Sequence, residues 1–177
     1  GQKRTPETPE GHRPNVITFP KLSTARIRVV LAPRSFLAVG LTELEAWGPC
    51  TMPLTQPHLP AGDLALQAKA SASYTWTEDS ASAINDGIIS MSGGPRNRWT
   101  AYKTPNPSDW LQLDFPSPVT VGRMEICFWA DDGGVRVPQS YKILNWNGNQ
   151  WADVNERSRN PQQPTLLTSN EVTIDPV

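Results

Sequence analysis

Ala25-Arg-Ile-Arg-Val-Val30 is the stretch that decides the fold of this 177-residue chain. The apolar Ile27 and Val29 alternate with two arginines, which is the two-residue period of a β-strand with one buried and one solvated face. Gly40-Leu-Thr-Glu-Leu-Glu-Ala-Trp47 follows with a second alternation. Together they predict two strands near the start of the chain.

Further strand-like stretches occupy residues 16–19, 64–74, 110–115, 121–129, 140–146, 150–154 and 171–174. Asn147-Gly148 separates two of them and predicts a tight hairpin turn. A turn around Asp79–Ala83 is the nearest approach to a helical pattern. Many short strands punctuated by Pro, Gly and Asn predict an all-β fold, either a β-sandwich or a jelly roll.

The distribution of proline divides the chain. Residues 1–14 are rich in Pro, Glu, Lys and Arg without apolar periodicity, and we expect a tail there. Residues 15–48 hold the first strands. Residues 49–61 contain four prolines and predict an extended linker. Residues 62–177 form the main body.

Charge and composition exclude several classes of partner. A formal net charge of -1 and a pI near 6.1 provide no attraction for nucleic acid or an anionic membrane. No apolar run approaches the roughly 20 residues that span a bilayer. The two cysteines, Cys50 and Cys127, permit either one disulfide or two separate thiols, and exclude a metal site built from cysteines.

The sequence offers no well-held catalytic arrangement. A glycosidase needs two carboxylates about 5–10 Å apart across a cleft, whereas Glu78-Asp79 and Asp131-Asp132 are adjacent pairs whose side chains diverge on a turn. His12 and His58 lie in Pro-rich irregular segments, so neither is a well-positioned base. We therefore expect a non-catalytic protein.

Two predicted loops carry the residue types that bind sugars. Trp129-Ala-Asp-Asp-Gly-Gly-Val-Arg136 combines an aromatic ring, two carboxylates and a guanidinium, and Tyr74-Thr-Trp-Thr-Glu-Asp79 is polar around a second tryptophan. Aromatic rings pack on the C–H face of a sugar, while charged planar groups hydrogen-bond its hydroxyls. The candidate binding residues are Trp76, Trp129, Asp131, Asp132 and Arg136, with Arg98 and Tyr102 in second rank. The alternative is a salt-bridged turn joining Asp131 or Asp132 to Arg136.

The other tryptophans have structural interpretations. Trp99 and Trp110 lie beside strand signals and are expected in the core, because a buried indole contributes a large apolar area. Trp146 and Trp151 flank the predicted hairpin and are expected to pack across it.

Several short blocks carry a family resemblance, among them Ala83-Ile-Asn-Asp-Gly87, Arg98-Trp-Thr100, Trp110-Leu-Gln-Leu-Asp-Phe115, Ser140-Tyr-Lys-Ile143 and Gly40-Leu-Thr-Glu-Leu-Glu45. Together they resemble the galactose-binding-like, coagulation-factor type C (discoidin) superfamily. More narrowly, they resemble the accessory modules of secreted microbial glycosidases that act on plant polysaccharides. The resemblance covers residues 13–48 and 62–177.

The order of these blocks departs from the family. Family members end with strands like those of residues 15–48, which here come first. One interpretation is a circular permutation, closed within the chain or by exchange with a second copy. The other is the junction of tandem modules. In both cases we expect the first segment to complete the sandwich, because missing strands would expose sheet edges and core.

The resemblance also implies a metal site. Members of the superfamily often hold a structural Ca²⁺ through an aspartate, nearby carbonyls and a glutamate of the last strand. Asp86, in the Asn-Asp-Gly turn, and Glu43 match those positions, and oxygen ligands suit Ca²⁺. The alternative is a plain turn without an ion and a solvent-facing Glu43.

These observations predict a non-catalytic carbohydrate-binding module that keeps a secreted, extracellular glycosidase on plant-type polysaccharide. Its partners would be a poly- or oligosaccharide and the catalytic domain of the parent enzyme. The alternatives are a structural or protein-interaction domain that braces the catalytic domain, and a fragment that supplies one wall of a glycosidase active site.

Overall fold

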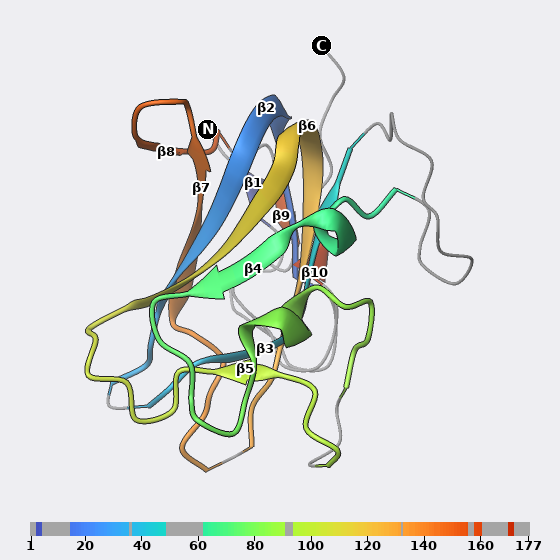
Figure 1. The fold of residues 1–177 in the computed structure, drawn as a ribbon. Helices are drawn as coiled ribbons and strands as arrows, with labels where there is room; N and C mark the ends of the chain where they lie inside the picture. Colours follow the sequence, from blue (N-terminus) through green and yellow to red (C-terminus); the bar gives the residue numbers. More distant parts are fainter. Residues whose placement is uncertain are drawn as a thin grey trace.

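Two long strands, β2 (Asn15–Ala32) and β6 (Asp109–Phe128), run antiparallel along most of their length. They pair from Asn15 opposite Ile126 to Leu31 opposite Asp109 in the computed structural model, where they lie side by side (Figure 1). The structure describes residues 3–4, 15–35, 37–48, 62–90, 94–131, 133–155, 158–160 and 170–171.

The remaining elements are short. They are β1 (Lys3–Arg4), β3 (Gly40–Trp47), η1 (Ala65–Gln67), β4 (Lys69–Ala72), η2 (Ala81–Ile84), β5 (Trp99–Thr100), β7 (Ser140–Trp146), β8 (Trp151–Asp153), β9 (Ser158–Asn160) and β10 (Asn170–Glu171). No helix among the described residues is long and apolar enough to cross a membrane.

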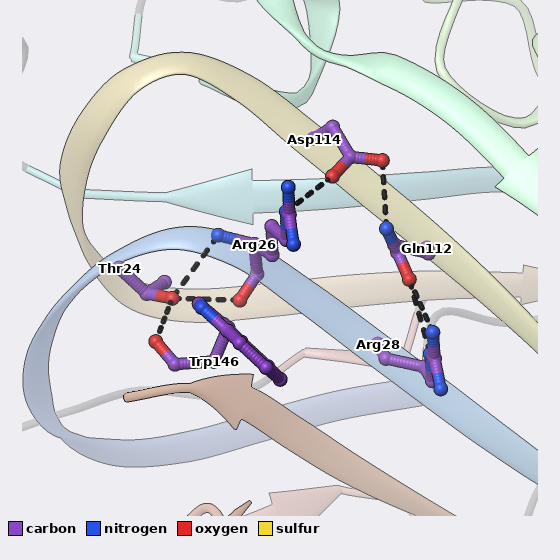
Figure 2. Close-up of polar contacts among 6 residues, drawn as sticks. All are labelled: Thr24, Arg26, Arg28, Gln112, Asp114 and Trp146. Atoms are coloured by element: carbon purple, nitrogen blue, oxygen red, sulfur yellow. Dashed lines mark hydrogen bonds and ion pairs between the residues drawn. The ribbon is translucent and has the colours of Figure 1, made fainter. Parts of the chain in front are cut away.

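The two long strands contribute to both layers of a β-sandwich. Residues 26–32 of β2 pair with 109–114 of β6 and also with β7, while this part of β6 pairs with β4, and β7 in turn pairs with β8. The other halves of β2 and β6 pair with β3, β9 and β10, and β3 in turn pairs with β5. The β2–β6 register shifts on either side of Leu22–Thr24, where both ribbons bend (Figure 2). The predicted all-β sandwich is confirmed.

The core follows the alternation seen in the sequence. Ile27, Val29 and Leu31 of β2 are fully buried, as are Leu111 and Leu113 of β6. They belong to one apolar cluster, which also contains the fully buried Trp99, as predicted. Burial of such side chains contributes roughly 1.5–3 kcal/mol each, so this cluster holds the two layers together.

On the outward face of β2 and β6, a cationic side chain stacks on aromatic rings. The Arg28 guanidinium lies 4.1 Å from the Trp110 ring centroid and 4.0 Å from that of Trp151, and it donates hydrogen bonds to Gln112. Figure 2 shows the continuing ladder, in which Gln112 donates to Asp114 and Asp114 pairs with Arg26. The expected core position of Trp110 is wrong, because its place in the alternation is on the outer face with Gln112.

The sequence located most strands but not their extents. The predicted strand at 64–74 is divided, since η1 precedes β4 and only Lys69–Ala72 pairs with β6. The stretches 110–115 and 121–129 merge into β6, and 16–19 merges with 25–30 into β2. The hairpin between β7 and β8 is confirmed, with Trp146 and Trp151 in edge contact at 5.5 Å.

Residues 15–48 lie inside the sheet. Residues 123–126 of β6 are flanked by β2 on one side and by β3 on the other, so the first segment of the chain covers both edges of this half of β6, whereas residues 111–114 lie between β2 and β4. The predicted linker lies outside the described residues, and so do Cys50 and most of the tail. Cys127 is a buried free thiol. The division into tail, strands, linker and body stays a prediction.

Asp63 fastens the end of β3 to η1. Its Oδ1 accepts hydrogen bonds from the N–H groups of Ala46 (3.1 Å) and Ala65 (2.9 Å). Its Oδ2 makes no hydrogen bond within the described residues, and the side chain is buried. The pKa of Asp63 is raised to about 6, mainly by desolvation. The hydrogen bonds from the two N–H groups lower this pKa in part, and the charge of Glu125 raises it further.

We expect Asp63→Asn to become more stable relative to the parent protein as the pH rises. The folded-state pKa of Asp63 lies above the unfolded value, so protonated Asp63 stabilises the fold at low pH, and this contribution is lost between about pH 4 and pH 6. The difference in unfolding free energy should change by up to about 3 kcal/mol, since one pKa unit corresponds to about 1.4 kcal/mol. Urea denaturation of both proteins between pH 4 and pH 7, with a chelator present, measures this difference in unfolding free energy. A difference that does not vary with pH would contradict a raised pKa.

Candidate functional site

An open pocket of about 230 Å³ lies where three loops meet beyond β5 and β6. The loops are those after β4, before β5 and after β6. The pocket is lined by Trp76, Asp79, Arg96, Arg98, Thr100, Tyr102, Trp129, Asp131, Gly134 and Val135.

Main-chain hydrogen bonds fix the loops of the pocket to neighbouring strands. The N–H of Trp76 donates to the carbonyl of Thr100 (3.0 Å), and the N–H of Trp129 donates to that of Gly40 (2.9 Å). Ala38 pairs with the loop after β6 through a bridge to Val135. The pocket is therefore built on the sheet rather than on free loops, which favours precise positioning of its side chains.

A buried ion pair forms its polar floor. Arg98 is only 9% exposed, and its Nε lies 3.5 Å from Oδ1 of Asp79. Asp79 Oδ2 accepts a hydrogen bond from Thr100. Within the described residues, however, Nε and Nη1 of Arg98 and Oδ1 of Asp79 are buried without a hydrogen-bond partner. Unfilled donors and an unfilled acceptor therefore lie together in one pocket, an arrangement that is costly unless something else bonds to them.

Aromatic side chains form the wall. Trp76 and Tyr102 meet edge to face with their centroids 5.1 Å apart. Gly134 packs against Tyr102 so closely that a Cβ there would lie 2.5 Å from its ring. Trp129 is 6% exposed, and the Arg98 guanidinium lies over its ring at 3.7 Å. The open aromatic surface therefore belongs to Trp76 and Tyr102, while Trp129 supports Arg98.

Asp131 shapes the loop after β6. Its Oδ1 accepts hydrogen bonds from the N–H groups of Gly133 (2.8 Å) and Val135 (3.0 Å), and lies 3.9 Å from Nη1 of Arg136. This is the salt-bridged turn of the alternative interpretation, although Asp131 also lines the pocket. Arg136 is not among the lining residues, and Asp132 lies outside the described residues.

Five of the residues named from sequence thus share one pocket: Trp76, Trp129, Asp131, Arg98 and Tyr102. Sequence reasoning missed Asp79, Arg96 and Thr100. An extended segment carries Arg96, Arg98 and Thr100 on one side, because they are two residues apart. This spacing is the feature of the sequence that could have identified Arg96 and Thr100 together with Arg98. Arg96 also pairs with Glu78 and lies 3.8 Å from Asp79.

A second group of polar residues surrounds Glu43 on β3. Glu43 is fully buried, and neither carboxylate oxygen makes a hydrogen bond within the described residues. The Asp86 turn lies close to it, with Asp86 Oδ1 accepting from the N–H of Ile88 (2.9 Å). The loop is fastened to β3, because the N–H of Ser90 donates to Thr42. The solvent-facing Glu43 of the alternative interpretation is therefore wrong.

Electrostatics at Glu43 show the lack of a counter-charge. Desolvation raises the pKa of Glu43 to about 10, with further increases from the charges of Asp63, Asp86 and Glu45. The N–H of Gly87 lowers it in part, although this contact is too loose to count as a hydrogen bond. A buried carboxylate without a partner favours either a bound proton or a cation. The described residues contain no cluster of three His, Cys, Asp or Glu side chains that could hold a metal, so carbonyl oxygens would have to complete any coordination.

A family model for the F5/8 type C domain matches residues 67–177, more than half of the chain. The chain belongs to this family. F5/8 type C domains, also called discoidin domains, commonly bind carbohydrate or act as protein-interaction modules, and the family is non-catalytic. No solved structure matches the chain.

The family membership supports the predicted galactose-binding-like fold and agrees with the expectation of a non-catalytic protein. It covers β4 to the end of the chain, whereas β2 and β3 lie before the matched residues. The pocket of this F5/8 type C domain therefore combines matched residues with main-chain support from Ala38 and Gly40, which precede them.

Proposed function

We propose that this F5/8 type C domain is a non-catalytic carbohydrate-binding module that targets a secreted glycosidase to plant-type polysaccharide. One observation carries the proposal. Arg98 and Asp79 line an open pocket beside Trp76 and Tyr102, and their buried Nε, Nη1 and Oδ1 atoms have no hydrogen-bond partner in the part of the chain that the structure describes.

Sugar chemistry matches this combination. A hydroxyl group both donates and accepts, so neighbouring hydroxyls of one ring can bond to Arg98 and Asp79 together. Aromatic side chains beside them supply apolar contact for the C–H face. The volume of about 230 Å³ is below the usual range for drug-sized ligands, which favours a single sugar unit. Weak binding of this kind is sufficient for targeting, because attachment to an enzyme raises the local concentration.

A protein-interaction role that braces a catalytic domain is the second candidate. Ile88 and Ile89 are 56% and 45% exposed on the loop beside Asp86. Exposed large apolar side chains next to each other are typical of contact surfaces. In this role the sandwich would pack Ile88 and Ile89 against the catalytic domain, and the pocket would show no sugar affinity.

We further propose that Asp86 and Glu43 hold a structural Ca²⁺ together with main-chain carbonyls. The fit rests on the orphaned carboxylate of Glu43 and on the charge of Asp86 beside it. Bound calcium would supply the missing positive charge and tie β3 to the loop after η2.

We expect Arg98→Ala to reduce polysaccharide affinity about tenfold or more, because hydrogen bonds to charged groups contribute about 1.5–3 kcal/mol. Asp79→Asn should weaken binding as well. Affinity gel electrophoresis on arabinan, galactan and rhamnogalacturonan, after a glycan array, measures this.

Arg26→Ala on the outer face is the matched control and should bind like the parent protein, since Arg26 lies in the ladder with Asp114 and not in the pocket. Retention by no polysaccharide would contradict the function. Equal binding by Arg98→Ala would contradict the assignment of the pocket.

We expect calcium to raise the melting temperature, with a stabilisation of about 2.7 kcal/mol at a hundredfold excess over Kd. Asp86→Ala and Glu43→Gln should each remove most of this gain, because each removes a charged ligand. Asp153→Asn is the control, since that carboxylate is exposed and pairs with Lys142. Identical midpoints with calcium and with chelator would mean that no ion is held.

A further inference from the structure

A second pocket of about 320 Å³ adjoins the first. It is lined by Pro33, Ser35, Leu37, Ala38, Ala101, Lys103, Thr104, Asn106 and Pro107. Residues 100–103 form a partition between the two pockets. Thr100 and Tyr102 line the first pocket, while Ala101 and Lys103 line the second. A β-bridge joins Val135, which lines the first pocket, to Ala38, which lines the second.

The walls of the second pocket are held in unusual backbone geometry. Ser35 (φ 50°) and Lys103 (φ 61°) are the non-glycine residues with positive φ among the described residues, and both line it. Such conformations are disfavoured for residues with a Cβ and cluster at functional sites.

Asp109 holds two polar lining residues of the second pocket in place. It is buried, and its Oδ1 accepts hydrogen bonds from Thr104 Oγ1 (3.3 Å) and Asn106 Nδ2 (2.9 Å). Two of the polar lining residues are therefore fixed before any ligand arrives, which reduces the entropy lost on binding.

Lys103 differs from the other cations at these pockets. Arg96 pairs with Glu78, and Arg98 pairs with Asp79. Lys103 has no carboxylate within ion-pair distance among the described residues. Its ammonium lies 5.1 Å from the Trp76 ring centroid and 5.4 Å from that of Tyr102, so the two aromatic rings keep this charge at the partition.

We infer that the second pocket is a subsite for the next unit of the same glycan, and that Lys103 selects an acidic unit there. The acidic group is a uronate carboxylate or a sulfate ester, since either pairs with an ammonium. This inference rests on the proposed function, because it requires one sugar unit in the first pocket. The ligand is then an acidic oligosaccharide of at least two units.

The test compares four probes by isothermal titration calorimetry: galactose, a neutral galacto-oligosaccharide, an oligogalacturonide of equal length, and a sulfated galacto-oligosaccharide. We expect the oligosaccharides to bind more tightly than galactose. An acidic probe should exceed the neutral one by about fivefold at low salt, the gain from one solvent-accessible ion pair. This gain should disappear near 1 M NaCl, where the Debye length is about 3 Å.

Lys103→Gln should lower the ratio of the affinities for the acidic and neutral oligosaccharides to about one, whereas Lys103→Arg should retain the preference for the acidic probe. The acidic probe whose affinity depends on Lys103 identifies the group as carboxylate or sulfate. Equal affinity for neutral and acidic probes, with Arg98→Ala weakening both, would overturn the inference and leave the proposed function standing. Binding of none of the four probes would overturn the inference, and, together with retention by no polysaccharide, it would overturn the proposed function as well.

Discussion

The antiparallel pairing of β2 with β6 is the interaction on which the rest of the structure depends. Both strands bend from one layer of the sandwich into the other, so their pairing fixes how the layers face each other. It buries Ile27 and Val29 against the same core as Leu111 and Leu113. Because β2 belongs to the first segment and β6 to the body, neither segment can complete a core without the other.

The same pairing positions both candidate sites. β6 ends at Phe128, so Trp129 begins the pocket loop at a fixed point, and β3 holds Glu43 beside β6 on the other edge. Trp129 in turn supports the guanidinium of Arg98. Buried polar atoms of Arg98, Asp79 and Glu43 have no hydrogen-bond partner among the described residues, and they therefore lie at places that the sheet holds rigid. Unsatisfied polar groups are costly, and such costs are typical of binding sites.

Local sequence patterns predicted features with a local physical cause. The alternation around Ile27 identified the buried face, and Asn147-Gly148 identified the hairpin. Trp76, Arg98 and Tyr102 were singled out because their residue types suit sugar contact, and the structure places them in one pocket, while their role in binding stays a prediction. The bends in β2 and β6 were not predictable, since a two-residue period continues through a bend. Trp110 was placed wrongly because hydrophobicity outweighed its position in the alternation, and the cation that stacks on it, Arg28, comes from a distant strand. Asp79 was missed because its partner Arg98 is near only in space.

Amide hydrogen exchange measured by NMR tests the central claim, that the first segment is an integral part of the sheet. Amides over Ile27–Leu31 and over Leu111–Leu113 should exchange only through opening reactions of similar free energy, close to that of global unfolding. Rapid exchange throughout Ile27–Leu31, alongside protected amides in β6, would show that β2 is not held against β6 and would contradict the account.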